Sequence, residues 1–200
     1  MLAVSTARDH RRMEHIIRTT RADEWQKIKA LRLAALRDPM ASIAFLETYE
    51  NASAQPDSHW QERARNNAEG ISVVTFVAEG PDGEWAGSVT VLVEVPGQDT
   101  VFGRPTTVPQ THVVGVYVRP EHRGTGIAQE LFRAAIDWAW AYPYAGGSGI
   151  ERVRLYVHER NGRAEALYRS LGFERTGVTV PMEGDPSATE YELALWRPGQ

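Results

Sequence analysis

The feature that most constrains the fold is a change of pattern in the second half of the chain. Residues 112–118 form a short segment rich in β-branched side chains, Gly124 and Gly126 follow, and apolar residues then recur at helical spacing as far as Ala139. A strand that leads through a glycine turn into a helix leaves the first helical N–H groups unpaired and directs their partial positive charge at one point. This arrangement suits a phosphate or pyrophosphate group. The sequence therefore predicts an anion site where this strand meets this helix.

Two common phosphate-binding motifs do not fit the glycines. A P-loop needs Gly-x-x-x-x-Gly-Lys-Ser/Thr, and the residues from Gly124 onward have neither that spacing nor the lysine. A dinucleotide fingerprint needs a third glycine where this chain has Gln129. An ordinary loop before a helix remains an alternative on these residues alone.

The rest of the chain alternates short strands and helices, which predicts one α+β domain over residues 15–197 because no linker or repeat divides it. Strands are expected at residues 16–18, 72–79, 85–95, 112–118, 152–158, 173–180 and 190–196. Helices are expected around residues 25–36, 58–68, 125–139 and 161–171. Residues 40–58 and 96–110 are expected to be irregular, and residues 1–14 to form a flexible arm.

Composition excludes several classes of function. The 200 residues carry a formal charge of −4 and no cysteine, so thiolate metal sites, disulfides and a cysteine nucleophile are excluded. The acidic balance argues against a nucleic-acid partner. No apolar run is long enough to span a membrane, no secretory pattern opens the chain, and we expect a cytoplasmic location. The histidines lack metal-site spacing, which predicts no metal. All cationic residues except Lys27 and Lys29 are arginine, which indicates a bacterial source.

Two motifs resemble the GNAT superfamily of N-acetyltransferases. Arg123, Gly126 and Ala128 match its acetyl-CoA signature, Arg/Gln-x-x-Gly-x-Gly/Ala, and a later block from Asn161 to Phe173 resembles the family's second motif. The resemblance covers roughly residues 16–196. It implies an α+β fold with a bent mixed β-sheet, helices on both faces, and parallel strands 112–118 and 152–158 that splay apart at the cofactor site. Acetyl-CoA is the implied co-substrate.

The resemblance also implies roles for individual residues. Backbone groups of Val116 and Val118 are expected to pair with pantetheine, and an N–H group near them to act as oxyanion donor. Asn161 is expected to cap a helix and to contact the pantetheine arm, and Arg163 is a candidate contact of the 3′-phosphate. The implied cofactor-binding set is Val116, Val118, Arg123, Gly124, Thr125, Gly126, Ile127, Ala128 and Asn161.

The implied activity is direct transfer of acetyl from acetyl-CoA to a primary amine, without an acyl-enzyme. Tyr168 would be the catalytic acid that protonates the departing thiolate. Its spacing with Ala164, Leu167 and Leu171 also fits a core tyrosine. The alternative function is a non-catalytic acyl-CoA-binding regulatory module, which would retain the turn from Arg123 to Ala128 but lose the acid, so the presence of Tyr168 speaks against it.

The general base and the acceptor stay open. Candidate bases are His112, Glu47, Glu50, Tyr117, His158 and a water relay, and each of these side chains has an ordinary structural explanation. The acceptor is a small-molecule or peptide amine, and the acidic side chains of residues 40–62 favour a cationic one. The chain is expected to be a monomer or homodimer. The loop at residues 96–110 is a lid, a dimer contact or a disordered insertion.

Overall fold

The structure, a computed structural model, describes residues 15–199 except 101–102, 145–146 and 148. The expected N-terminal arm at residues 1–14 lies outside the described residues. In chain order the elements are β1 Ile16–Thr19, α1 Trp25–Leu36, the 3₁₀ helix η1 Ala41–Ile43, α2 Tyr49–Ser53, α3 Asp57–Glu69, β2 Val73–Glu79, β3 Trp85–Glu94, β4 Gln110–Val118, the 3₁₀ helix η2 Pro120–His122, α4 Ile127–Ala141, β5 Arg152–His158, α5 Gly162–Ser170, β6 Glu174–Met182 and β7 Asp185–Trp196.

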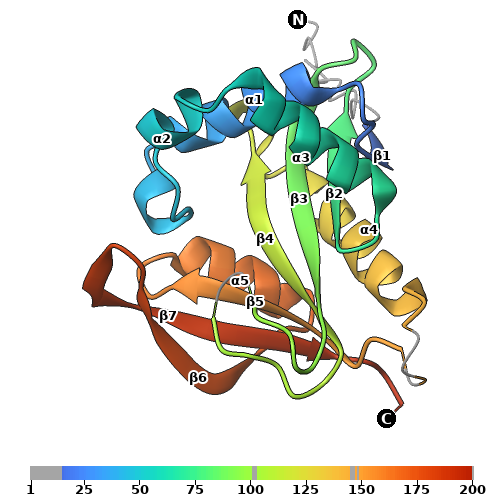
Figure 1. Ribbon diagram of the computed structural model, residues 1–200. Helices are drawn as coiled ribbons and strands as arrows, with labels where there is room; N and C mark the ends of the chain where they lie inside the picture. Colours follow the sequence, from blue (N-terminus) through green and yellow to red (C-terminus); the bar gives the residue numbers. More distant parts are fainter. Residues whose placement is uncertain (1–14, 101–102, 145–146, 148, 200) are drawn as a thin grey trace, which may run out of the picture.

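The described strands form one seven-stranded sheet in the order β1-β2-β3-β4-β5-β7-β6. All neighbours are antiparallel except β4 and β5. The parallel pairing of β4 with β5 begins at Gln110 and Arg152 and ends two residues later, at His112 and Arg154. Beyond this point the two strands diverge, as Figure 1 shows. The expected mixed sheet with splayed parallel strands is confirmed.

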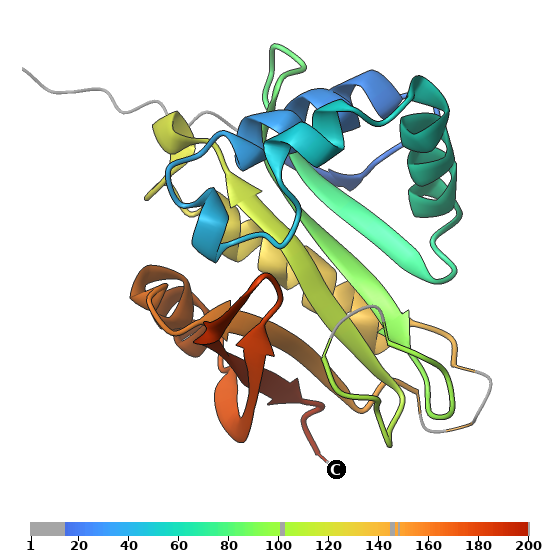
Figure 2. The same ribbon diagram turned by 60° about the vertical axis from the view of Figure 1, so that its left-hand side comes forward.

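Two hydrophobic cores lie on opposite faces of the sheet (Figures 1 and 2). On one face, α1, α2 and α3 pack around the fully buried Trp60. On the other, α4 and α5 pack around Phe132, which contacts the rings of Tyr168 and Phe173. Burial of these large aromatic and aliphatic side chains is the main stabilising term for both layers. The prediction of helices on both faces is also confirmed.

Three boundaries differ from expectation. Residues 40–58 contain the short helix α2, because the Thr48 hydroxyl caps it by accepting the Asn51 N–H at 3.2 Å. Strands β6 and β7 run up to a tight turn at residues 183–184. The edge position of β6 explains why that strand tolerates Pro181. Strand β4 starts at Gln110, inside the expected loop, since it pairs there with both β3 and β5.

None of the described helices is both long enough and apolar enough to cross a membrane.

Candidate active site

A bulge in β4 creates the opening between β4 and β5. Thr90 of β3 pairs with Val114 and Ser88 pairs with Tyr117, so β4 holds one residue more than β3 over this stretch. Gly115 lies in the bulge with a φ of 61°, which L side chains rarely adopt. Because the pairing with β5 has already stopped, the last part of β4 has no partner on that side among the described strands. Apart from the Val118 carbonyl, which accepts a hydrogen bond from Arg123 Nε, its backbone groups on that side are available to a ligand.

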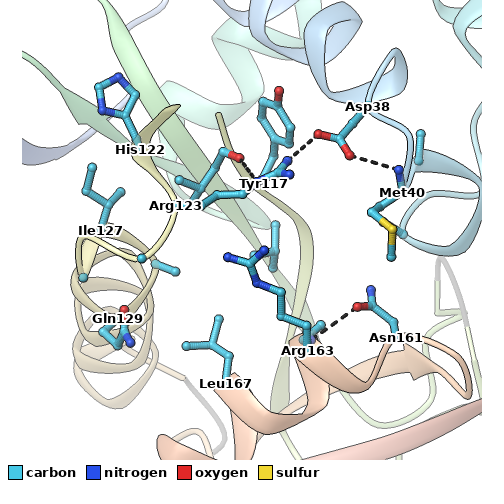
Figure 3. A pocket seen from close by; sticks show the side chains of 18 of the residues that line it. Asp38, Met40, Tyr117, His122, Arg123, Ile127, Gln129, Asn161, Arg163 and Leu167 are labelled. Carbon is cyan, nitrogen blue, oxygen red and sulfur yellow. Dashed lines mark hydrogen bonds and ion pairs between the residues drawn. The ribbon is translucent and has the colours of Figure 1, made fainter. Parts of the chain in front are cut away.

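A cleft of about 430 Å³ occupies this opening (Figure 3). The end of β4, the following turn, the start of α4, one side of α5 and the segment after α1 form its walls. Of the nine residues predicted to bind the cofactor, all but Thr125 line it. The Thr125 hydroxyl instead donates to the His122 carbonyl at 2.7 Å, which holds the turn.

The N-terminus of α4 opens into this cleft without a side-chain cap. Gly126 is the N-cap residue, with a φ of 97°, and it provides no side-chain cap for the first helical N–H groups. Gly126, Ile127, Ala128 and Gln129 all line the cleft. A 15-residue helix therefore directs its unpaired donors and positive end at the space where the sequence predicts an anion.

Two arginines line the cleft in different ways. Arg123 joins the turn to the end of α1, because its Nε donates to the Val118 carbonyl at 2.9 Å and its guanidinium binds the Asp38 carboxylate. Arg163 extends from α5 into the middle of the cleft (Figure 3). Among the described residues, Arg163 has no hydrogen-bond or ion-pair partner. Arg163 is therefore the cation in the cleft that is free to meet an anionic ligand.

Asn161 and Tyr168 hold the second wall, formed by α5. The Asn161 side chain caps this helix by accepting the Ala164 N–H at 3.3 Å, and Asn161 also lines the cleft. Tyr168 is 7% exposed and packs between Phe132 and Phe173, with ring centroids 5.3 and 6.4 Å away. It does not line the cleft, although Leu167 before it does. Burial raises the pKa of the Tyr168 phenol, which therefore stays protonated at neutral pH.

A second cavity, of about 470 Å³, adjoins the cleft. It lies between the segment from η1 to α2 and the turn that joins β6 to β7, and Ala41 and Phe45 line both spaces. Its titratable and charged lining residues are Glu47, Tyr49, Glu50, His158, Arg160, Glu183 and Asp185. Four carboxylates against one arginine make this cavity acidic. We call it the acidic cavity.

Comparison with known proteins identifies the family. A sequence model of the acetyltransferase (GNAT) family matches residues 25–173, which is most of the chain and includes every residue that lines the cleft. The chain belongs to the acetyltransferase (GNAT) family.

Several members of the family are similar to this chain. A mycothiol acetyltransferase of Thermobispora bispora is 38% identical over 78 residues, which are 39% of this chain and 24% of that protein. The streptothricin acetyltransferase of Streptomyces lavendulae is 30% identical over 125 residues, 62% of this chain and 57% of that protein. The chain thus spans only part of the length of these relatives. The structure of Arabidopsis thaliana NAA60 in complex with acetyl-CoA has the same fold, with a TM-score of 0.64, 16% identity, and coverage of 93% of this chain and 100% of that chain.

The candidate bases of this GNAT chain do not lie together. Glu50 and His158 line the acidic cavity, and so does Glu47, which is paired with Arg32 at 2.8 Å. Tyr117 lines the cleft. His112 lines neither space.

His112 belongs to a buried polar network on β3, β4, β5 and β7. Its Nδ1 lies 3.0 Å from a Glu94 oxygen, and burial lowers its pKa. Arg154, 1% exposed, binds Glu94 at 2.7 Å and Glu192 at 3.1 Å. The Arg104 carbonyl accepts from Arg154 at 2.9 Å, so this part of the loop at residues 96–110 lies on the network. The described residues of this loop, 96–100 and 103–110, do not line the acidic cavity.

Sequence reasoning missed the segment after α1 as a wall of the cleft. Asp38, Met40, Ala41, Ala44 and Phe45 all line it. The available signal was Pro39, which ends the helix and redirects the chain, followed by apolar residues that no helix explains. That signal predicts a turn after the helix. Only the tertiary structure shows that the segment after the turn forms a wall of the cleft.

Proposed function

We propose that this chain is an acetyl-CoA-dependent N-acetyltransferase that acts on a primary amine of a small molecule or peptide. The observation that carries the proposal is that the cofactor cleft and the acidic cavity, which differ in charge, adjoin each other. An anion-binding cleft, with an uncapped helix N-terminus and unpaired strand backbone, opens beside an acidic cavity. Membership of the GNAT family supports the same assignment.

The cleft has the groups that acetyl-CoA needs. The N–H groups from Gly124 to Gln129 bind the pyrophosphate, and the unpaired Arg163 binds a further phosphate. Backbone groups of Val116 and Val118 pair with the pantetheine amides, and Asn161 contacts that arm. One N–H group in this part of β4 polarises the thioester carbonyl. Such preorganised donors contribute about 3 kcal/mol to lowering the barrier of acyl transfer.

Tyr168 is the proposed acid. Its phenol is protonated at neutral pH because burial raises its pKa, and it lies on α5 next to the cleft-lining Leu167. It gives its proton to the thiolate as the C–S bond breaks. No acyl-enzyme forms, because the chain has no cysteine. The amine attacks the thioester directly.

The acidic cavity is the proposed acceptor site. Its carboxylates attract an amine that arrives as an ammonium ion, so the expected acceptor is cationic. Relatives are named for a small-molecule acceptor such as streptothricin and, in Mycobacterium tuberculosis, as an N-alpha-acetyltransferase. Both small molecules and peptide N-termini therefore belong in a substrate search.

A non-catalytic acyl-CoA-binding module is the second candidate. One observation favours it, because Tyr168 is buried in the apolar core and does not line the cleft. Such a module binds acetyl-CoA in the same cleft and transfers nothing.

Two measurements on the full chain decide between these functions. The first is calorimetric titration with acetyl-CoA, and with ATP and NAD as controls. The second is thiol release from acetyl-CoA in the presence of a polyamine, an aminoglycoside, an amino-acid amide or short peptides. Acetyl-CoA binding with amine-dependent thiol release supports the transferase. Binding without thiol release across the panel supports the module, and binding of ATP or NAD in place of acetyl-CoA overturns both.

A further inference from the structure

Two buried polar side chains near the acidic cavity each carry one atom that the described part of the fold leaves without a partner. His158, at the end of β5, is 2% exposed, and Glu190, on β7, is 8% exposed. His158 Nε2 and Glu190 Oε2 are both inaccessible to solvent and lack a hydrogen-bond partner among the described residues. Buried polar atoms in native proteins almost always have partners. Two orphaned groups side by side therefore indicate a functional site.

The sheet places the two side chains together and on the cavity side. His158 and Glu190 are directly opposite in the antiparallel register of β5 and β7, so they share a face with their Cβ atoms about 5 Å apart. The next pair on this face, Tyr156 and Glu192, confirms the orientation by a 2.9 Å hydrogen bond. His158 lines the acidic cavity.

The turn that follows β5 connects His158 and Glu190 to the cofactor cleft. The Asn161 N–H donates to the His158 carbonyl at 2.8 Å, which closes a tight turn after β5. Asn161 lines the cleft, whereas His158 lines the acidic cavity. The pair therefore lies where the two spaces approach each other, which is where an amine must meet a thioester.

The imidazole's hydrogen bonding decides which of the two groups accepts a proton. The Arg160 N–H donates to His158 Nδ1 at 3.0 Å, so the neutral ring carries its proton on Nε2. Nε2–H can donate a hydrogen bond but cannot accept a proton. The carboxylate of Glu190 is the acceptor that remains.

We propose that Glu190 is the general base of this transferase and that His158 is a positioning residue beside it. The inference rests on the proposed function. An N–H bond of the acceptor ammonium breaks, and its proton forms an O–H bond on the Glu190 carboxylate, directly or through one water. The electron pair left on nitrogen attacks the thioester carbonyl. The His158 Nε2–H donates to the same carboxylate or water and holds it in place.

The surroundings of Glu190 suit this role. Burial raises the pKa of Glu190 to about 7, close to the operating pH at which a general base is most effective. No ion pair among the described residues holds its charge. The charged and titratable groups of the neighbouring elements are Tyr156 and His158 on β5, Glu159 and Arg160 after it, Asp185 and Glu192 on β7, Glu183 in the turn before β7, and Glu47, Tyr49 and Glu50 across the cavity.

The test is the pH dependence of kcat/KM for Glu190→Gln, measured by thiol release with acetyl-CoA and an amine of the panel that the wild-type chain acetylates. The wild-type profile should rise with an apparent pKa near 7. In Glu190→Gln we expect about a 100-fold loss at pH 7, recovery toward pH 10 as the free amine becomes abundant, and an unchanged Kd for acetyl-CoA. Glu190→Asp should restore part of the limb near pH 7. A wild-type profile in Glu190→Gln overturns the proposal.

Substitutions of His158 and of an exposed glutamate complete the experiment on pH dependence. His158→Leu should move the rising limb upward in pH, and His158→Gln, which keeps an N–H donor, should restore it. Glu174→Gln, on the exposed edge strand β6, should leave the profile unchanged. Misfolding is recognised by thermal denaturation and by loss of acetyl-CoA binding. If the wild-type chain releases no thiol with any amine, the proposed function itself fails, and the base assignment fails with it.

Discussion

At the scale of single residues, the two arginines of the cleft have different roles: one holds the wall of the cleft and the other is free to bind a ligand. Arg123 belongs to the signature motif, yet its guanidinium is engaged by Asp38 and by the Val118 carbonyl. Arg163 has no such partners among the described residues and enters the cleft. The motif could be recognised from the sequence, but the partner of Arg123 lies 85 positions away and could not. Arg123 therefore shapes the site mainly by holding its wall.

These two arginines should give opposite results on substitution. Arg123→Met should lower the free energy of unfolding by about 2 kcal/mol, because the buried Asp38 carboxylate loses its cation, and this is measured by urea denaturation. Arg163→Met should leave stability within about 0.5 kcal/mol, since its side chain is exposed and unpaired. It should weaken acetyl-CoA binding roughly tenfold in calorimetry by loss of a phosphate contact. Equal effects of the two substitutions on stability would contradict this assignment.

Tyr168 allows the acid role and the core role to be measured separately. Tyr168→Phe keeps the ring that packs on Phe132 and Phe173 and removes only the hydroxyl. We expect kcat to fall about 100-fold, as for loss of a general acid, with the Kd for acetyl-CoA and the melting temperature nearly unchanged. The measurement is steady-state thiol release, with Tyr191→Phe on β7 as the matched control. Wild-type turnover in Tyr168→Phe would leave Tyr168 as a core residue only.

At the scale of elements, strand and helix positions were predictable where periodicity is local. The helices α1, α3, α4 and α5 and the hairpin of β2 and β3 follow from apolar spacing and from turn residues. The full length of the β6–β7 hairpin was not predictable, because Pro181 and Pro186 lack the N–H group that a strand needs for pairing and so predict that the strands end. They are tolerated because β6 is an edge strand and because β7 pairs with β5 only from Glu190 onward.

A substitution at the start of α4 tests whether the N-terminus of this helix binds the anion. Gly126→Ala places a Cβ on a residue with a φ of 97°, so we expect a loss of about 1–3 kcal/mol in unfolding free energy. Relaxation of that strain should reorient the first N–H groups of the helix and weaken acetyl-CoA binding. Gly162→Ala is the matched control, since Gly162 begins α5 with φ outside the left-handed region and open space around its Cβ position. It should bind acetyl-CoA normally in calorimetry.

At the scale of the whole molecule, function depends on where β4 and β5 separate. The bulge at Gly115 and the end of pairing at His112 open the cleft, and the turn after His158 divides it from the acidic cavity. The strands could be predicted from the sequence, but their register could not, and the register decides which polar residues face each other. His112 illustrates the point, since the register places it beside Glu94 in a buried network rather than in either cavity.

Register also gives two neighbouring glutamates of β7 opposite effects on global stability. Glu192 meets Arg152, Arg154 and Tyr156, so Glu192→Gln should lower the melting temperature at neutral pH because it leaves a buried arginine with fewer partners. Glu190 has no such partners in the part of the chain that the structure describes, and burial raises its pKa from 4.5 to about 7. Its charged form is therefore a cost to the folded state that Glu190→Gln removes.

The sign of the Glu190 effect follows from proton uptake. Below pH 4.5 the carboxyl is protonated in both the folded and the unfolded chain, so Glu190→Gln should match the wild type there. Between pH 4.5 and about 7 only the unfolded chain releases the proton, so the wild type loses stability as pH rises. Above that window Glu190→Gln should be more stable by about 3 kcal/mol, or roughly 9 °C in melting temperature. Thermal denaturation at pH 4 and pH 8 measures the difference, and an equal melting temperature at pH 8 would show that Glu190 has a partner in solution.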